Sequence, residues 1–136
     1  RAIRLRQDFV RQTDFLRQLL IENPRNRMAY EYGMAWLLLT KNLAGFVQLF
    51  DTYHSGVESR IPRHYEEALL LAKALNAGGL NPDVRSVGQE SRDRFASFAK
   101  ARQPFGQDMA AARRSLRGGF GDTFYYHFFF SDSGAR

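Results

Sequence analysis

The sequence predicts an all-α protein built from antiparallel helical hairpins. Apolar residues recur at helical spacing along most of the chain, and breaks that contain proline or glycine separate segments of helical length. The clearest case lies between Asn23 and Tyr53. There, a turn at Asn23-Pro24 leads into an apolar segment, which breaks at Lys41-Asn42 before a second apolar segment begins at Leu43. This is the pattern of two antiparallel helices joined by a tight turn.

The composition is that of a folded domain. The 136 residues are enough to enclose a core, and 44% of them are hydrophobic and 14% aromatic. No cysteine is present, so disulfides, thiolate metal sites and cysteine nucleophiles are excluded. These residues contain no apolar run of transmembrane length and no signal peptide. Because the chain begins at Arg1 inside helical sequence, we expect one helical repeat-like domain over residues 1–136 that is a piece of a longer protein.

Six amphipathic helices are expected before the C-terminal segment. Asn23-Pro24 ends the first, because the residue before a proline is driven out of the helical region. Ser55-Gly56 stops the third, Pro62 suits the first turn of the fourth, and Gly118-Gly119 interrupts the sixth. The expected helices cover residues 3–22, 27–40, 43–54, 63–75, 84–102 and 105–120.

The C-terminal segment, residues 120–136, is an aromatic tail. Seven aromatic side chains crowd into the eleven residues from Phe120. Aromatic runs favour strands by propensity, but a lone strand in an all-α chain would leave its backbone groups unpaired. We therefore predict a short helix capped by Asp122 or Thr123. One short helix has too little inward surface for all of these rings. We therefore expect residues 124–130, with Phe124, Tyr125 and Phe128 as the named contacts, to bind either a second copy of the chain or the missing remainder of the parent protein. The alternative is a cap across the open end of the helical stack, with Tyr125, Tyr126 and His127 facing water.

The first hairpin resembles the tetratricopeptide repeat. Asn23-Pro24-x-Asn26 is similar to its inter-repeat turn, Tyr30 stands where that repeat usually has tryptophan, and Lys41-Asn42-Leu43 is similar to its helix-joining turn. Phe50 matches the aromatic residue of its second helix, and we expect Phe50 and Trp36 to lie in the core. Gly33-Met34 and Phe46 depart from the repeat's pattern.

The tetratricopeptide resemblance implies an α-α superhelix, a fold that usually serves as an interaction scaffold. In such repeats, side chains of the first helix face a concave surface that accepts a segment of a partner. By this resemblance, the expected partner-binding residues of the first hairpin are Met28, Glu31, Ala35, Leu38 and Leu39. Their simplest alternative role is packing inside the hairpin.

A second resemblance covers nearly the whole chain. The segments NPRNRMAYEYGMAWLLLTKNL, RIPRHYEEALLL and FGDTFYYHFFF are similar to the C-terminal region of a family of bacterial membrane proteins of unknown function. This resemblance implies membrane attachment upstream of Arg1 and brings no known activity. Basic residues at Arg1, Arg4 and Arg6 would favour the cytoplasmic side, whereas repeat-like tails of such proteins often face outward. We expect the periplasmic side.

Residues with catalytic or metal-binding chemistry are sparse. The three histidines, His54, His64 and His127, have no metal-ligand spacing. Glu66-Glu67 fall in the first turn of their expected helix, where negative charge complements the helix dipole. The glycines from Gly118 to Gly121 lack the strand and the lysine of a phosphate loop, so they are better explained as a helix terminator. We therefore expect no enzyme, no metal and no cofactor.

The net charge of +6 leaves a second class of partner open. Arginines and one lysine give the fifth and sixth helices a basic surplus, and basic surfaces attract phosphates. These basic residues are Arg85, Arg92, Arg94, Lys100, Arg102, Arg113, Arg114 and Arg117. The plainer explanation is a solvated helical face. The leading hypothesis is a non-enzymatic protein-interaction domain; the alternatives are an accessory domain of a membrane enzyme and a nucleic-acid-binding domain.

Overall fold

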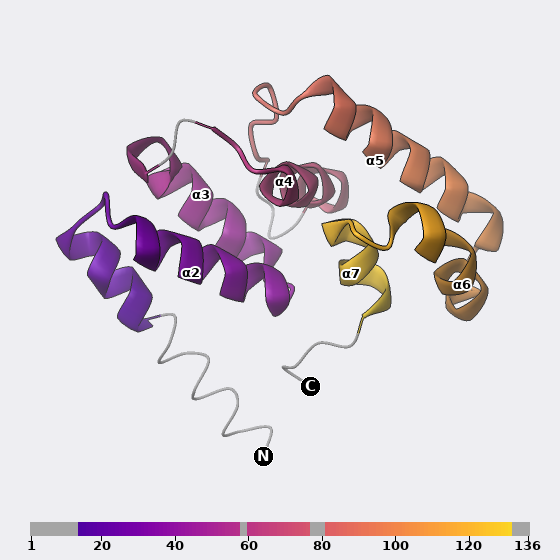
Figure 1. Cartoon of the computed structure of the whole chain (residues 1–136), viewed down its shortest axis with the longest axis horizontal. Coiled ribbons are helices and arrows are strands. Elements are labelled where there is room, and N and C mark those ends of the chain that lie inside the picture. Colours follow the sequence, from indigo (N-terminus) through magenta and orange to yellow (C-terminus); the bar gives the residue numbers. More distant parts are fainter. Residues whose placement is uncertain (1–13, 58–59, 77–80, 132–136) are drawn as a thin grey trace, which may run out of the picture. The chain divides into compact units, whose positions relative to one another are not determined.

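The computed structural model describes residues 14–57, 60–76 and 81–131. Every regular element in these ranges is a helix, which confirms the all-α prediction (Figure 1). Residues 14–22 are helical, and the rest of the expected first helix lies outside the described residues. The elements that follow are α2 (Arg27–Leu39), α3 (Leu43–Val57), α4 (Arg63–Leu75), α5 (Gln89–Arg102), the short 3-10 helix η2 (Gln103–Phe105), α6 (Met109–Phe120) and α7 (Phe124–Phe130).

The chain divides into two compact units. Unit 1 holds the helix over residues 14–22 together with α2 and α3, and unit 2 runs from Ile61 to Ser131. Helices within unit 2 pack as a group, with α4 against α5 and α7, and α6 against α5 and α7. The prediction of one domain over residues 1–136 stays a prediction.

Short polar side chains determine where most of the helices begin. Asn26, Asp108 and Thr123 each accept a hydrogen bond from the backbone N–H three residues further on, at 3.1, 3.1 and 3.2 Å. Asn42 does the same for the first turn of α3, at 2.9 Å to the Gly45 nitrogen. Each cap satisfies a backbone donor that has no partner inside its own helix. The predicted cap of the aromatic segment is thereby confirmed as Thr123.

Several predicted boundaries were wrong. The sixth helix begins at Met109 and not at residue 105, because Asp108 caps it and residues 103–105 form the separate helix η2. Helix α3 continues through Ser55-Gly56 to Val57, because a glycine late in a helix weakens it without ending it. Helix α5 begins at Gln89, since the residues before it form a turn closed by a hydrogen bond from the Val87 nitrogen to the Val84 carbonyl. Helix α6 includes Gly118-Gly119 and ends with Gly121 as its C-cap.

Two glycines let α2 and α3 approach closely in unit 1. A Cβ atom on Gly45 would lie 2.9 Å from Leu37 Cδ2, and one on Gly33 would lie 3.2 Å from Leu49 Cδ2. The turn between the helices places Lys41 at a φ of 62°, a left-handed conformation that is common at a helix end. The hairpin predicted from the sequence is therefore closely packed.

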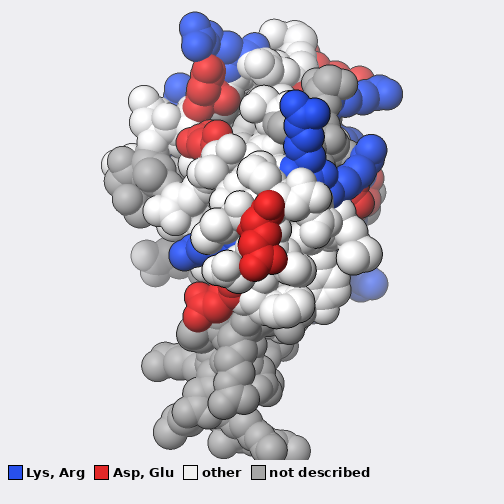
Figure 2. Space-filling view, turned by 90° about the vertical axis from the view of Figure 1, so that its left-hand side faces the viewer, with Lys and Arg blue, Asp and Glu red and all other residues white. Residues whose placement is uncertain are grey.

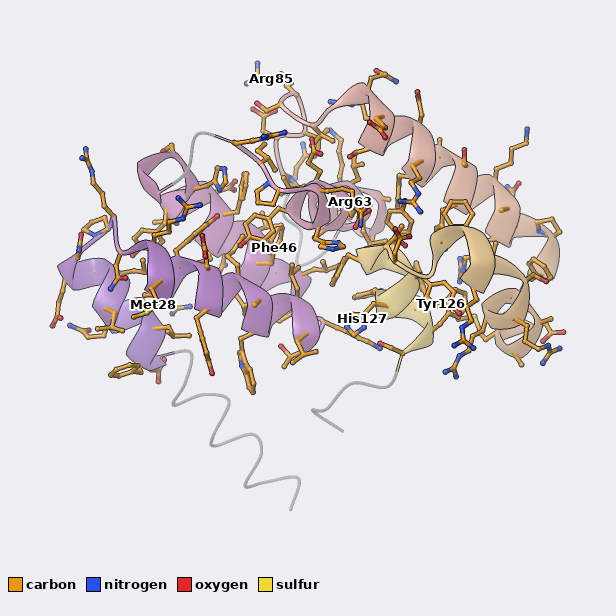
Figure 3. All side chains as sticks on the ribbon, in the orientation of Figure 1. Met28, Phe46, Arg63, Arg85, Tyr126 and His127 are labelled. Carbon is orange, nitrogen blue, oxygen red and sulfur yellow. The ribbon has the colours of Figure 1, made fainter. Side chains whose placement is uncertain are left out.

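The core of the hairpin differs from the prediction. Tyr30, Met34 and Phe46 are fully buried, whereas Trp36 and Phe50 are only half-buried. Figure 3 labels Phe46. Inside the hairpin, the Tyr30 hydroxyl lies 2.9 Å from His54 Nδ1. The Phe50 ring stacks on His54, with 4.4 Å between the ring centroids. On α2 the buried face is thus rotated from Trp36 towards Tyr30 and Met34, and on α3 Phe46 is more deeply buried than Phe50.

In unit 2, two adjacent glutamates of α4 reach the starts of two other helices. Glu66 accepts hydrogen bonds from the backbone nitrogen of Gly88 at 2.7 Å and from the Ser91 hydroxyl at 2.9 Å. Gly88 is the N-cap of α5 and has no side chain to cap that helix. Glu66 therefore supplies the acceptor that α5 lacks, from a position 22 residues earlier in the chain.

Glu67 does the same for α7. Its side chain is 1% exposed, and Oε1 accepts a hydrogen bond from the backbone nitrogen of Phe124, the first residue of α7, at 3.0 Å. Two further contacts of this carboxylate come from its own helix. His64 Nδ1 lies 2.9 Å from Oε1, and Arg63 Nε lies 3.7 Å from Oε2. A buried carboxylate with several donors is a stable arrangement that becomes costly when one member is removed.

We predict that Glu67→Met destabilises unit 2 by about 1–3 kcal/mol, because it leaves the buried Phe124 N–H without an acceptor while nearly preserving side-chain volume. Urea unfolding followed by circular dichroism measures this change. Glu90→Met is the matched control, since Glu90 is an exposed carboxylate in the first turn of α5. The control should change stability by less than about 0.5 kcal/mol. Equal effects of the two substitutions would contradict the capping role of Glu67.

Candidate functional site

Helix α2 has one inward and one outward arc. Its buried residues, Ala29, Tyr30, Gly33, Met34 and Leu37, recur at the spacing of a single helix face. The remaining arc is on the surface, although most of it is also apolar. A helix that is apolar all round is normally covered on all sides. In the described part of the chain, α2 is covered on one side only.

The outward arc carries a continuous apolar stripe. Its members are spaced by four, three and four residues, which places them one above another along the helix. Three are large and strongly exposed: Met28 at 76%, Tyr32 at 52% and Leu39 at 55% of their accessible surface. The small residue Ala35 lies between Tyr32 and Leu39 and is also exposed. We call these four residues the α2 stripe; Figure 3 labels its first member, Met28.

Most of the residues expected on the binding face of the first hairpin lie on or beside this stripe. Met28, Ala35 and Leu39 belong to it. Glu31 is exposed on its flank and pairs with Arg27 at 2.7 Å, and Leu38 is half-buried. Tyr32 was missed, although its spacing of four residues from Met28 and seven from Leu39 is a signal that the sequence contains. Whether these residues bind a partner stays a prediction.

A cavity of about 170 Å³ lies in unit 1 among the helix over residues 14–22, α2 and α3. Its lining is mainly apolar and includes Leu16, Leu20, Trp36 and Leu49. Among the described residues that line it, Arg17 is the only one with a charge. The cavity therefore offers space for apolar groups, and no aspartate, glutamate or histidine is among the described residues that line it.

The aromatic C-terminal segment is largely built into unit 2. Phe124 and Tyr125, two of the expected partner-binding residues, are 5% and 0% exposed, and Phe128 is half-buried. The Tyr125 ring lies 5.2 Å from that of Phe95 and 4.7 Å from that of Phe98, between ring centroids. The expectation that Tyr125 faces water in a capping tail is wrong. Its ring fills the space between α5 and α7.

Tyr125 is an unusual core residue because of its hydroxyl group. The oxygen is buried, and it has no hydrogen-bond partner among the described residues. Burial raises the pKa of Tyr125 to about 12, and the nearby Glu67 carboxylate acts in the same direction. The neighbouring Tyr126 differs, since its hydroxyl donates a hydrogen bond of 2.8 Å to the Arg113 carbonyl.

Several basic side chains of unit 2 are bound within the protein. Arg85 pairs with Asp83 at 2.8 Å and lowers the pKa of that carboxyl to about 2. Arg92 donates to the backbone carbonyls of Val84 and Val87, and the Arg102 guanidinium lies 4.4 Å from the centre of the Phe129 ring. Figure 2 shows both basic and acidic side chains on the face that it draws, some of them in contact with one another. Part of the basic surplus therefore has a structural role, and the nucleic-acid alternative stays a prediction.

Arg94 connects α5 to the end of α6 and to the junction between α6 and α7. Its guanidinium lies 2.7 Å from the Asp122 carboxylate and 2.8 Å from the Gly119 carbonyl at the end of α6. The pair with Arg94 lowers the pKa of Asp122. An open hollow beside it is lined by Arg94, Arg117, Asp122, Tyr126 and the glycines of this segment. Two guanidinium groups and one carboxylate therefore line the hollow, and the Arg94 guanidinium is already bound to the Asp122 carboxylate.

Neither metal-binding nor membrane-spanning features occur in the part of the chain that the structure describes. No group of three His, Asp or Glu side chains in residues 14–57, 60–76 and 81–131 could hold a metal ion. Over the same ranges, no helix has the length and apolar character needed to cross a membrane.

These features define an all-helical protein with an exposed apolar helix face. Comparison with protein families then places it. The chain matches the model of the "Family of unknown function (DUF6057)" over residues 1–131, and it belongs to that family. No curated protein and no solved structure matches it.

We predict that alkaline pH destabilises the protein through Tyr125. Since the folded-state pKa is about 12 and the ordinary value is 10.0, ionisation is easier in the unfolded chain. The contribution of this phenol is complete below pH 10 and is lost as the pH rises from about 10 towards 12, by roughly 2–3 kcal/mol at most.

Urea unfolding of wild type and of Tyr125→Phe at pH 7 and pH 11 measures this contribution. At pH 7 the variant should be as stable as wild type or more stable, because the removed hydroxyl has no partner in the described structure. At pH 11 the free energy of unfolding of the variant should exceed that of wild type by more than it does at pH 7. An advantage that stays constant between the two pH values would contradict the assigned ionisation.

Proposed function

We propose that this chain is a non-enzymatic protein-interaction domain and that the α2 stripe is its docking surface. The observation that carries the proposal is the exposure of Met28, Tyr32 and Leu39 along one helix face. Large apolar side chains arranged contiguously on a surface usually mark an interface, whereas single exposed ones need no explanation. Unit 2 provides the comparison, because its exposed large apolar residues, Leu75 and Met109, lie on two different helices.

The sequence of α2 supports the same role. A solvent-exposed helix face usually carries polar residues, but the four positions of the α2 stripe hold methionine, tyrosine, alanine and leucine. These are residue types that contribute large contact area at interfaces or allow close approach of two helices. The flanking Arg27–Glu31 pair supplies a polar edge to the stripe.

The cellular setting is part of the proposal. The resemblance to C-terminal regions of bacterial membrane proteins supports attachment to a membrane upstream of Arg1. An interaction domain held there would capture its partner close to the membrane, on the periplasmic side by our expectation. The proposal assigns no reaction and no cofactor to these residues.

We predict that a photoreactive amino acid at position 32 forms a discrete covalent adduct with protein when the full-length parent protein is irradiated in cells. The same amino acid in place of the exposed Ala96 of α5 should give none. Combining the probe with Met28→Ser and Leu39→Ser should reduce the adduct by at least about tenfold, because each apolar side chain buried at an interface contributes roughly 1.5–3 kcal/mol.

Leu75→Ser is the matched control, since it also removes an exposed leucine but lies outside the stripe. It should leave the adduct unchanged. Because the substituted stripe positions are exposed, folding stability should change by less than about 0.5 kcal/mol in these variants. The absence of a protein adduct at position 32, or an equal adduct at position 96, would overturn the proposed function.

A further inference from the structure

We infer that the α2 stripe binds a second copy of this chain, with the two α2 helices packed antiparallel. The inference rests on the proposed function and names its partner. Its basis is the order of side-chain sizes along the stripe. When a second α2 runs in the opposite direction, Met28 of one copy lies opposite Leu39 of the other, and Tyr32 lies opposite Ala35.

This register is self-complementary. It creates two identical pairs of Tyr32 with Ala35 at the centre and two identical pairs of Met28 with Leu39 at the ends. A large ring thus meets a small side chain, so that the helices can approach to the usual 8–10 Å between axes. The two-fold axis of this dimer passes level with the Gly33–Met34 peptide. Both copies use the same surface patch for the contact, as two-fold symmetry requires.

A parallel pair fits less well. It would set Tyr32 against Tyr32 and Ala35 against Ala35, because equivalent residues then meet at the axis. Two large rings would hold the helices apart at one level, and two small side chains would leave a gap at the next. The spread of sizes along the stripe therefore favours the antiparallel arrangement.

The charges beside the stripe are compatible with this contact. Each Glu31 is paired with Arg27 of its own helix at 2.7 Å, so each flank brings a neutral pair to the interface. The net charge of +6 on each chain opposes association at long range, but physiological salt screens this repulsion beyond about 8 Å. The half-buried Trp36 lies on the same side of α2 as Tyr32, within reach of Tyr32 of the second copy.

The contact should be weak. One pair of short helices buries less than the roughly 1,200–2,000 Å² of a stable, specific complex. Unit 1 exposes two more large apolar side chains, Phe15 and Ile21, on the helix that precedes α2. Local concentration on a membrane would raise the dimer population of such a weak contact.

Disulfide trapping tests both the partner and the direction. The chain has no cysteine, so introduced thiols are the only ones that react. Met28→Cys chains and Leu39→Cys chains are mixed and oxidised gently at physiological salt. The mixed dimer should form at least about tenfold faster than the dimer of either variant alone, because only the mixture brings two thiols within the roughly 7 Å Cα separation that a disulfide allows. Ala35→Arg, added to both chains, should abolish the mixed dimer.

Each other outcome overturns the inference. Rapid dimerisation of Met28→Cys alone would indicate a parallel pair. A mixture that reacts no faster than a mixture of Ala96→Cys and Leu75→Cys chains would show that copies do not meet through α2. If that result accompanies a protein adduct of different mass at position 32, the stripe binds another protein. The proposed function then survives and the second-copy inference fails.

Discussion

The arrangement of unit 2 depends on two adjacent carboxylates of α4 that serve different helices. Consecutive residues of an α-helix point about 100° apart, so neighbours in sequence face different elements. Glu66 accepts from the start of α5 and Glu67 from the start of α7. Both carboxylates also lie near the start of α4 itself, where the helix dipole favours negative charge. The N-terminal ends of α4, α5 and α7 therefore all lie close to Glu66-Glu67. The hydrogen bonds of these two residues hold α5 and α7 against α4.

Arg94 adds a second set of polar contacts near the start of α7. By joining Asp122 to the end of α6, it connects the α6–α7 junction to α5. The aromatic rings then fill the space that these polar contacts define, with Tyr125 against Phe95 and Phe98. The aromatic run thus has a structural role within its own unit. The outward face of α2 is therefore a better candidate for a partner-binding surface than the aromatic segment of α7.

The sequence predicted the helices better than it predicted the hydrogen bonds between residues that are far apart in the chain. The bounds of α4 were predicted correctly, because Pro62 and the glycine-rich sequence after Leu75 are strong local signals for the start and the end of a helix. The role of Glu66 and Glu67 could not be predicted in the same way. Their partners lie 22 and 57 residues away, and a Glu-Glu pair at a helix start has a sufficient local explanation. Periodicity found the helices of unit 1 but not the inward direction, because α2 is apolar on both arcs and the pattern cannot say which arc is buried.

The most direct test of this account follows the backbone amides of Gly88 and Phe124 by hydrogen exchange, in wild type, Glu66→Met and Glu67→Met. In wild type both amides should be protected. Glu67→Met should accelerate exchange at Phe124 by about tenfold or more while Gly88 stays protected, and Glu66→Met should do the reverse, because each substitution releases one helix start. Accelerated exchange at both amides in both variants, or at neither, would contradict the assignment of one carboxylate to each helix.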